Sequence, residues 1–258
     1  MIVQDNDKLI LITNDDGLYA AGLKTLTSVM KEFGKVVVIS ATESRSAMSQ
    51  ALTVKQPLRV KLLEETDDLR IYACSGTPTD GVKLAVNQLL ERKPDLLVSG
   101  INHGSNASAS VLYSGTMAAA LEGCLYGITS VGFSLNSYSP TADFTICEKY
   151  IRLICKMVLS KPLPEGVCLN VNMPAIEAAE IKGIRVARQA RGCWQEEFEK
   201  RKDPMGKTYY WLTGRFINHE PESTDTDEWG MKNGYVSVVP VSTDMTAYSY
   251  LSELKKEF

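Results

Sequence analysis

Short runs of apolar residues alternate with amphipathic segments over the first two-thirds of the chain. Continuous apolar runs are typical of strands that are covered by helices on both faces. Six segments have this character, namely 9–13, 36–39, 69–74, 95–99, 128–135 and 167–172. Strands separated by helices predict a mostly parallel α/β sheet, in which right-handed crossovers place helices on both faces.

Apolar spacing and capping residues predict helices between these strands. The segment before Gly34 repeats apolar residues at helical spacing, and the glycine is a natural helix stop. Thr77, Pro78 and Asp80 form a helix-start pattern, with a capping hydroxyl, a proline in the first turn and an acidic residue that completes the box. Further helices are predicted over 117–126, 143–159 and 248–258.

The pattern changes after residue 174, where charged residues rather than helices separate the strand-like segments. Residues 184–191 and 208–213 predict a long β-hairpin, which has no place in a parallel core and often serves subunit contacts. Four aromatic residues belong to it, Trp194, Tyr209, Tyr210 and Trp211. This is more aromatic surface than a lone hairpin buries, so we predict a homo-oligomer in which the hairpin crosses to a partner. The alternative is that these side chains fold back on their own domain.

A single domain over residues 1–258 accounts for this organisation. Its core covers about 1–175, and a β-rich extension with the C-terminal segment covers about 176–258. A further strand is predicted over 235–241.

Composition excludes several functional classes. The 258 residues include 28 lysines and arginines against 31 aspartates and glutamates, a net charge of −3, and 44% of them are apolar. Such a chain folds around a core and has no basic excess with which to hold polymeric nucleic acid. We expect no membrane span and no export signal, because no window approaches the roughly 18 apolar residues that a span needs. The six cysteines form no C-x-x-C pair, which favours reduced thiols in a cytoplasmic protein.

Polar residues gather where the predicted strands end, at the edge where open α/β sheets bind their ligands. Asp15 and Asp16 follow the first strand, and adjacent carboxylates repel each other unless positive charge lies between them. A divalent Mg²⁺ or Mn²⁺ ion would relieve this repulsion, and Ser46 and Asn102 offer further oxygen ligands from other strand ends. The alternative is a solvated turn with one helix-capping aspartate.

Ser114, Gly115 and Thr116 begin the small-residue helix. A helix N-terminus presents free N–H groups and the positive end of the helix dipole, which bind phosphate without basic side chains. The alternative is an ordinary serine cap with no ligand. Arg45 faces either the phosphate or a surface ion-pair partner, and His103 is either a proton donor to a leaving group or an incidental loop histidine.

Several catalytic motifs are absent from the sequence. There is no G-x-G-x-x-G for a dinucleotide, no D-x-D pattern for an aspartyl nucleophile and no G-x-S-x-G for a serine nucleophile. Gly206-Lys207-Thr208 lacks the upstream glycine of a P-loop and follows no buried strand.

With these residues identified, the chain closely resembles the SurE (stationary-phase survival protein) family of 5′/3′-nucleotidases. Six segments carry the resemblance in order: 10–17 (ILITNDDG), 44–53 (SRSAMSQALT), 76–85 (GTPTDGVKLA), 94–106 (PDLLVSGINHGSN), 114–123 (SGTMAAALEG) and 234–246 (GYVSVVPVSTDMT). Together they cover most of the chain and are far more specific than any one motif.

The resemblance implies a Rossmann-like, three-layer α/β domain with a C-terminal β-hairpin extension used in oligomerisation, assembled as a homodimer or homotetramer. It also implies one divalent metal ion per subunit, held by Asp15, Asp16, Ser46 and Asn102. By the same resemblance, the residues on the phosphate side are Asn14, Asn106, Ser114, Gly115 and Thr116. The chain departs from many members at 40–42 and at Ser108, two loop positions that shape the cleft.

The predicted function is that of a metal-dependent phosphomonoesterase that hydrolyses nucleoside 5′-monophosphates, and 3′-monophosphates as well. Asp15 or Asp16 would orient or deprotonate the attacking water. One alternative is a metal–nucleotide binding stress sensor without turnover, which would need fewer negative charges beside an anionic ligand. A second is a phosphatase with an aspartyl nucleophile, which the missing D-x-D pattern weakens.

Overall fold

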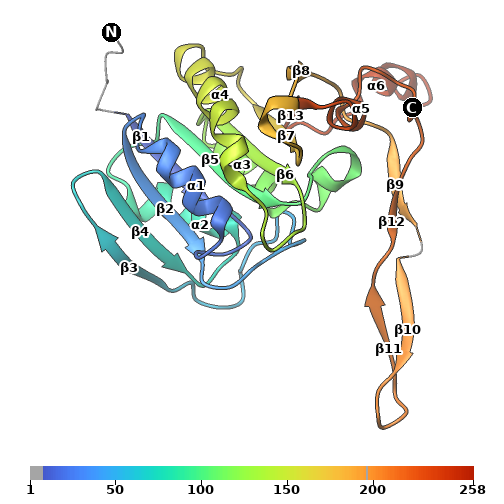
Figure 1. The fold of residues 1–258 in the computed structure, drawn as a ribbon, viewed down its shortest axis with the longest axis horizontal. Helices are drawn as coiled ribbons and strands as arrows, with labels where there is room; N and C mark the ends of the chain where they lie inside the picture. Colours follow the sequence, from blue (N-terminus) through green and yellow to red (C-terminus); the bar gives the residue numbers. More distant parts are fainter. Residues whose placement is uncertain (1–7, 196) are drawn as a thin grey trace.

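A computed structural model describes residues 8–195 and 197–258 of the chain. The described residues form a nine-stranded main sheet in the order β3-β4-β2-β1-β5-β6-β7-β13-β8 (Figure 1). Its strands are β1 (Leu9–Thr13), β2 (Lys35–Ala41), β3 (Val60–Glu65), β4 (Leu69–Cys74), β5 (Leu96–His103), β6 (Ser130–Asn136), β7 (Val167–Pro174), β8 (Gly183–Val186) and β13 (Tyr235–Ser242). The six strands from β4 to β7 in this order run parallel, while β3 and β13 run antiparallel to their inner neighbours. The predicted α/β fold class is therefore confirmed.

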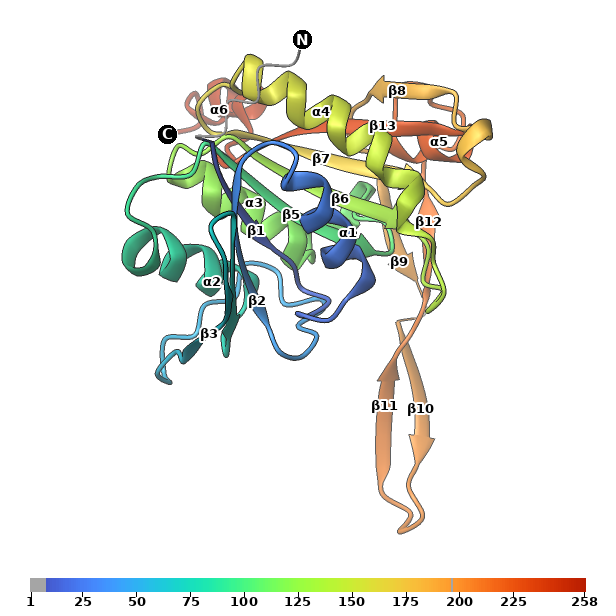
Figure 2. The ribbon, with the colours of Figure 1, turned by 60° about the vertical axis from the view of Figure 1, so that its left-hand side comes forward.

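Helices cover both faces of the sheet, as Figure 2 shows. Along β1, Ile10 and Ile12 pack with α1 (Ala21–Met30) and α4 (Glu148–Ser160), whereas Leu11 between them packs with α2 (Pro78–Leu84) and α3 (Gly115–Leu125). Successive side chains of a strand point to opposite faces, so the two helix pairs form two separate layers. The fold is a three-layer sandwich.

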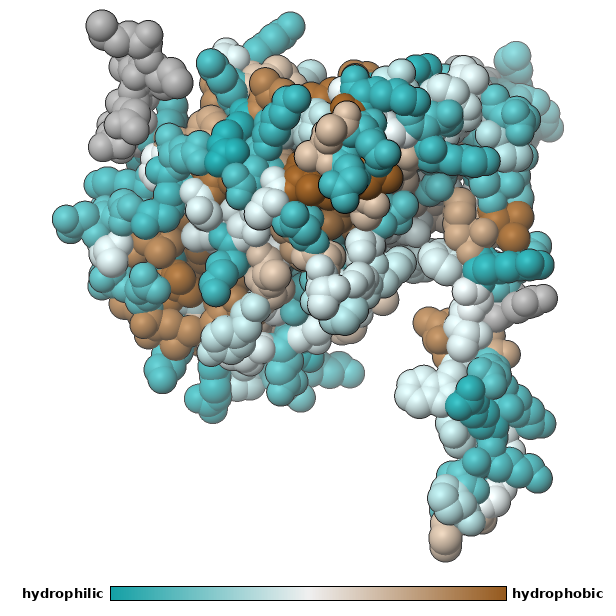
Figure 3. All heavy atoms as spheres, in the orientation of Figure 1, coloured by the Kyte–Doolittle hydropathy of each residue, from teal (hydrophilic) through white to brown (hydrophobic). Residues whose placement is uncertain are grey.

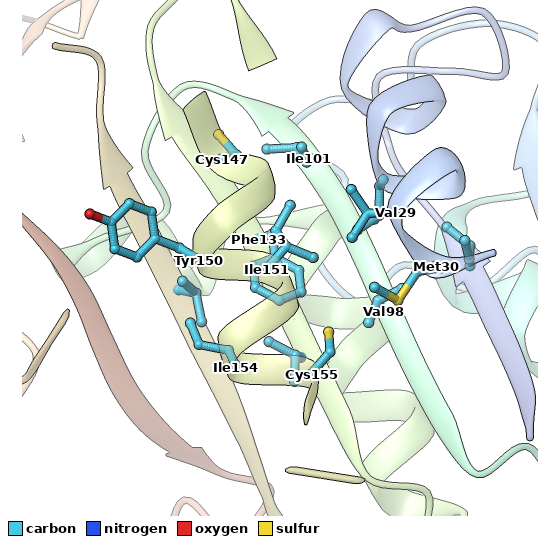
Figure 4. Close-up of a cluster of buried hydrophobic side chains, with 14 of the residues drawn as sticks. Val29, Met30, Val98, Ile101, Phe133, Cys147, Tyr150, Ile151, Ile154 and Cys155 are labelled. Atoms are coloured by element: carbon cyan, nitrogen blue, oxygen red, sulfur yellow. The ribbon is translucent and has the colours of Figure 1, made fainter. Parts of the chain in front are cut away.

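The largest hydrophobic cluster lies beneath α1 and α4 (Figure 4). Phe133 of β6 is fully buried there, and Ile151 and Cys155 reach it from α4. Met30 of α1 packs into the same cluster. This packing anchors the strands whose ends carry the candidate site.

Local signals placed the starts of α2 and α3 correctly, whereas the helix predicted from residue 143 begins as α4 at Glu148 after a 3₁₀ turn. Thr77 accepts the Asp80 N–H while Asp80 accepts the Thr77 N–H, which completes the predicted capping box of α2. Ser114 caps α3 with its hydroxyl alone, which accepts the Met117 N–H. The sequence patterns missed the antiparallel edge strand β3 and the short helix α5 (Asp227–Lys232), while the C-terminal helix is α6 (Tyr248–Leu254).

The predicted hairpin exists, but its first strand lies elsewhere. Residues 183–186 form β8, which pairs with β13 at the edge of the main sheet. The hairpin instead pairs β9 (Gly192–Gln195) with β12 (Arg215–Asn218), and β10 (Phe198–Lys202) with β11 (Thr208–Leu212). Strand propensity alone does not choose between these partners, because pairing depends on the path of the chain.

The hairpin extends far beyond the body of the molecule as an arm (Figures 1 and 2). Tyr210 and Trp211 are 59% and 57% exposed, and Phe198 and Leu212 opposite each other are also exposed. Figure 3 shows apolar and charged side chains interleaved along it. Within the protomer, these aromatic side chains therefore do not fold back on the domain.

Among the described helices, none has the length and apolar character to cross a membrane.

The order of the strands creates a switch point between β1 and β5. The chain leaves β1 for β2 on one side, and after β4 it crosses back to form β5 on the other side of β1. A crevice opens at the carboxyl ends of strands at such a point, and ligands bind there in open α/β sheets.

The core makes a prediction about stability. Ile151 of α4 is fully buried, whereas Leu153 on the same helix is 49% exposed. We expect Ile151→Ala to lower the free energy of unfolding by about 2–5 kcal/mol through lost burial and a residual cavity. Leu153→Ala should change it by less than about 0.5 kcal/mol. Urea denaturation of the two variants measures this difference, and equal losses would contradict the packing described here.

Candidate metal and phosphate site

Asp15 lies at the end of β1 against the start of α3. Its side chain is buried, and the Thr116 hydroxyl donates a hydrogen bond to its Oδ1 at 2.5 Å. A Cβ at position 115 would lie 2.9 Å from the Asp15 Oδ2, so the approach requires the glycine found there. The acid and the N-terminus of α3 are thus in direct contact.

Asp16 joins the end of β1 to the end of β5. Its Oδ2 accepts the backbone N–H of His103 at 2.9 Å. The side chain of Asn102 is buried nearby, with its Nδ2 donating to the carbonyls of His103 and Gly104. None of the hydrogen bonds recorded for the described residues uses the Asn102 Oδ1. Among the described residues, the Asn102 side chain thus has an amide oxygen without a hydrogen-bond partner, on the residue next to the one that Asp16 contacts.

Burial shapes the electrostatics of this pair. It raises the pKa of Asp15 to about 6, with the neighbouring Asp16 charge adding to the rise and the Thr116 hydroxyl opposing it. Burial also raises the pKa of Asp16, while the hydrogen bond from the His103 N–H and the charge of His103 act in the other direction. No lysine or arginine ion pair with either carboxylate is recorded for the described residues. Among the described residues, the pair therefore has no lysine or arginine as a counter-ion.

The loop after β2 brings Ser46 to the same place. The Arg45 N–H donates to the Asp15 carbonyl at 2.7 Å, and the Ser44 hydroxyl donates to the same oxygen at 3.3 Å. The hydroxyls of Ser44 and Ser46 lie 2.8 Å apart, and Ser46 is exposed. The Arg45 guanidinium donates to the Ser75 carbonyl at 3.3 Å, so it lies toward the segment after β4.

Asn14 supports the turn that carries the two acids. Its Nδ2 donates to the Gly17 carbonyl at 2.9 Å, and its Oδ1 accepts the Ser40 hydroxyl at 2.5 Å. Gly17 has a φ of +97°, a conformation that favours glycine. Both ends of the Asn14 amide are engaged within the protein.

The remaining predicted residues lie on the loop between β5 and α3 and at the helix start. The Ser114 hydroxyl accepts the Met117 N–H at 3.0 Å and caps α3. Asn106 is buried, and its Nδ2 donates to the Ser134 hydroxyl at 2.8 Å. His103 packs its ring edge-on against Phe144, with 4.7 Å between centroids.

Sequence reasoning missed the residues that hold Asn106 in place. Asn172 accepts the Asn106 N–H through its Oδ1, and Asn170 donates from its Nδ2 to the Asn106 carbonyl, each at 2.8 Å. The Asn172 Nδ2 donates in turn to the Asn170 Oδ1. Two polar residues at alternating positions of an otherwise apolar strand were the available signal, because such residues share one face.

Helix α5 places two acidic residues behind this loop, and sequence reasoning missed both. Asp227 is fully buried and accepts three backbone N–H groups, from Ser108, Ala190 and Glu228. Burial raises its pKa although these N–H groups act against the rise. Burial and the Asp227 charge raise the pKa of Glu228 to about 7.

The structure thus brings the ten predicted residues to one edge of the sheet. Asp15 contacts the α3 start, Asp16 contacts the segment of Asn102, and Ser46 reaches Asp15 through Ser44. Two carboxylates, one free amide oxygen and one exposed hydroxyl form a donor set of hard oxygens, which suits Mg²⁺ or Mn²⁺. Among the described residues, no cluster of three or more His, Cys, Asp or Glu side chains forms a competing site.

Comparisons with known proteins find similar sequences and a similar fold. A family model described as survival protein SurE matches residues 10–196. A protein of Flavobacterium psychrophilum named 5′-nucleotidase SurE is 52% identical over 247 residues, which cover 95% of this chain and 96% of that protein. A protein of Bacteroides fragilis with the same name is 48% identical over 253 residues, 98% of each chain. The crystal structure of the SurE protein from Aquifex aeolicus superposes with a TM-score of 0.82 at 36% identity, and the match covers 96% of this chain and 99% of that one.

The raised pKa of Glu228 predicts how stability depends on pH. A carboxyl with a pKa of about 7 in the folded state and 4.5 as its usual value stabilises the fold below about pH 4.5. This contribution is lost as pH rises through 7. We expect Glu228→Gln to match the parent protein at pH 4 and to be more stable by roughly 1–3 kcal/mol at pH 8.5.

Thermal or urea unfolding at the two pH values measures this effect. Glu222→Gln is the matched control, because Glu222 is exposed in the same region. If the two variants change the free energy of unfolding equally at pH 8.5, ionisation of Glu228 does not destabilise the folded state.

Proposed function

The chain belongs to the SurE family, and from this premise we propose that it is a 5′-nucleotidase, a hydrolase that releases phosphate from nucleoside 5′-monophosphates. The observation that carries the proposal is the buried Asp15–Asp16 pair, which has no lysine or arginine counter-ion among the described residues and contacts the N-terminus of α3. A carboxylate pair repels an anionic substrate unless a cation joins them, whereas the helix start attracts phosphate. Activity on 3′-monophosphates is part of the same proposal.

We assign one divalent cation per subunit, Mg²⁺ or Mn²⁺, to this site. Asp15, Asp16, Ser46 and Asn102 would hold it, and the free Oδ1 of Asn102 and the exposed Ser46 hydroxyl support that assignment. When bound, such an ion neutralises phosphate charge and lowers the pKa of water, which makes water an effective nucleophile.

The chain's own residues orient the reaction. Thr116 fixes the Asp15 carboxylate, and Asp15 or Asp16 orients the attacking water and accepts its proton. The N–H groups at Gly115 and Thr116, with Asn106 and Ser114, bind the phosphate oxygens on which charge develops. Asn14 supports this arrangement through the turn, and Arg45 through its backbone contact with Asp15. No covalent phosphoenzyme is needed.

The substrate is a small nucleotide and not polymeric nucleic acid, because a chain with a net charge of −3 gains little by counterion release. We place the enzyme in the cytoplasm, since all six cysteines are free and five are buried.

Assembly is the remaining part of the proposal. The arm exposes Tyr210, Trp211, Phe198 and Leu212 to solvent in the protomer, and apolar surface of this kind marks interfaces. We propose a homodimer or homotetramer in which the arm of one protomer packs against another. The chain then acts as one domain, with the segment from about residue 176 onward serving assembly.

The first test is phosphate release from 5′-AMP and 3′-AMP with Mn²⁺ or Mg²⁺. We expect chelation to abolish release, and Asp15→Asn to remain inactive at any metal concentration because it loses a full unit of charge. Ser46→Ala removes only a neutral ligand that water replaces, so high metal should largely restore its activity. The measurement is activity against metal concentration for the three proteins.

Asp67→Asn serves as the control, because Asp67 is exposed and remote from the site. Near-normal turnover by Asp15→Asn would remove the metal assignment. If Ser46→Ala were as inactive as Asp15→Asn at saturating metal, Ser46 would do more than coordinate. Binding of AMP and metal without phosphate release would favour a sensor over an enzyme.

The second test concerns the arm. We expect the protein at micromolar concentration to scatter light as a dimer or tetramer, and a Tyr210→Ser, Trp211→Ser double variant to shift toward monomer with an unchanged melting temperature of the protomer fold. Tyr138→Ser is the matched control, because Tyr138 is 74% exposed but lies off the arm. A parent protein that is cleanly monomeric would refute the assembly.

A further inference from the structure

Asp227 is a fully buried carboxylate whose recorded partners are all backbone N–H groups. Its Oδ2 accepts the Ser108 N–H at 2.8 Å, and its Oδ1 accepts those of Ala190 at 2.9 Å and Glu228 at 2.8 Å. Burying a charge is costly unless it is well hydrogen-bonded, and N–H groups bonded to a carboxylate form stronger bonds than neutral pairs do. Asp227 therefore holds these three peptides firmly.

The peptides that Asp227 holds belong to two segments far apart in the sequence. Ser108 starts a 3₁₀ turn between Asn106 and Ser114, on the loop to which we assign phosphate binding. Ala190 lies just before β9, at the root of the arm. The Ser108 hydroxyl adds a second link, because it donates to the Ala190 carbonyl at 2.8 Å.

The conformation of Ser108 explains why this loop needs an external support. Its φ is +50°, a left-handed conformation that residues other than glycine, asparagine and aspartate rarely adopt. The intrinsic backbone preference of serine therefore disfavours the conformation of this loop. The hydrogen bonds with Asp227 and Ala190 stabilise that conformation.

We propose that Asp227 is a positioning residue for the phosphoryl transfer. By holding the Ser108 peptide, it aims Asn106 and Ser114 at the phosphate and sets the loop in register with the root of the arm. The inference rests on the proposed function, because that function gives Asn106 and Ser114 their role. Asp227 itself touches neither of the proposed metal-binding carboxylates in the recorded contacts.

Asp227→Asn breaks the proposed link selectively. An asparagine of the same shape keeps its Oδ1 for the N–H groups of Ala190 and Glu228, but it turns an NH₂ group toward the Ser108 N–H. In the opposite orientation of the asparagine amide, the NH₂ group would face the N–H groups of Ala190 and Glu228, so two hydrogen bonds would be lost instead of one. We expect kcat for 5′-AMP to fall roughly 10- to 100-fold, because small misplacements of binding groups cost this much.

Two further readouts separate positioning from general damage. The affinity for Mn²⁺, measured calorimetrically without nucleotide, should be unchanged, since the four assigned ligands lie outside the loop. The melting temperature should fall, because the buried Ser108 N–H loses its acceptor, but the variant should remain folded at the temperature of the assay. Ser108→Ala removes only the hydroxyl link to Ala190, so we expect a smaller fall in kcat, about threefold, with the same Mn²⁺ affinity.

Asp225→Asn is the matched control, because Asp225 is an exposed carboxylate two residues away that pairs with Arg188 on the surface. It should leave kcat unchanged. Parent-like kcat in Asp227→Asn, or a fall accompanied by lost Mn²⁺ affinity, overturns the inference. If Asp227→Asn does not fold, Ser108→Ala is the deciding variant. A parent-like kcat in Ser108→Ala also overturns the inference that Asp227 positions the loop. A parent protein inactive on nucleotides would instead refute the proposed function.

Discussion

The close approach of the α3 N-terminus to the Asp15 carboxylate is the constraint on which the site depends. Glycine at 115 makes the approach sterically possible, and the Thr116 hydroxyl makes it favourable. The dipole at the start of a helix stabilises negative charge, so it offsets part of the cost of burying the acid. The proposed function assigns the phosphate to the backbone N–H groups at this helix start, which would let a chain of net charge −3 bind an anion without basic side chains.

Two further layers of hydrogen bonds hold this arrangement. Asn14 closes the turn after β1, and Asn170 with Asn172 holds both peptide groups of Asn106. Asp227 then holds Ser108, where the loop adopts a left-handed conformation. Each of these side chains is buried and has hydrogen-bond partners within the protein, because an unpaired polar group in the core would cost stability.

The arm and the site share a junction, although they are different kinds of structure. The body buries its apolar residues between a sheet and two helix layers, whereas the arm leaves Tyr210 and Trp211 exposed. The root of the arm at Ala190 bonds to Ser108 and to Asp227. A proposed assembly through the arm is thus connected to the proposed phosphate loop by a short chain of hydrogen bonds.

The sequence by itself determined most strands and helices of the parallel core and the main segments that meet at the site. Apolar runs, the Thr77–Asp80 capping box and the position of Asp15-Asp16 after a strand are local signals, and a local signal needs only neighbouring residues to act. The family resemblance added the assignment of roles to Ser46, Asn102 and the α3 start.

Only the tertiary structure decided which distant segments touch. It paired β8 with β13 instead of with the arm, turned Arg45 toward Ser75, and joined Ser108 to Asp227 across 119 residues. Such contacts leave little trace in local patterns, because a hydrogen bond between distant residues depends on the path of all the chain between them.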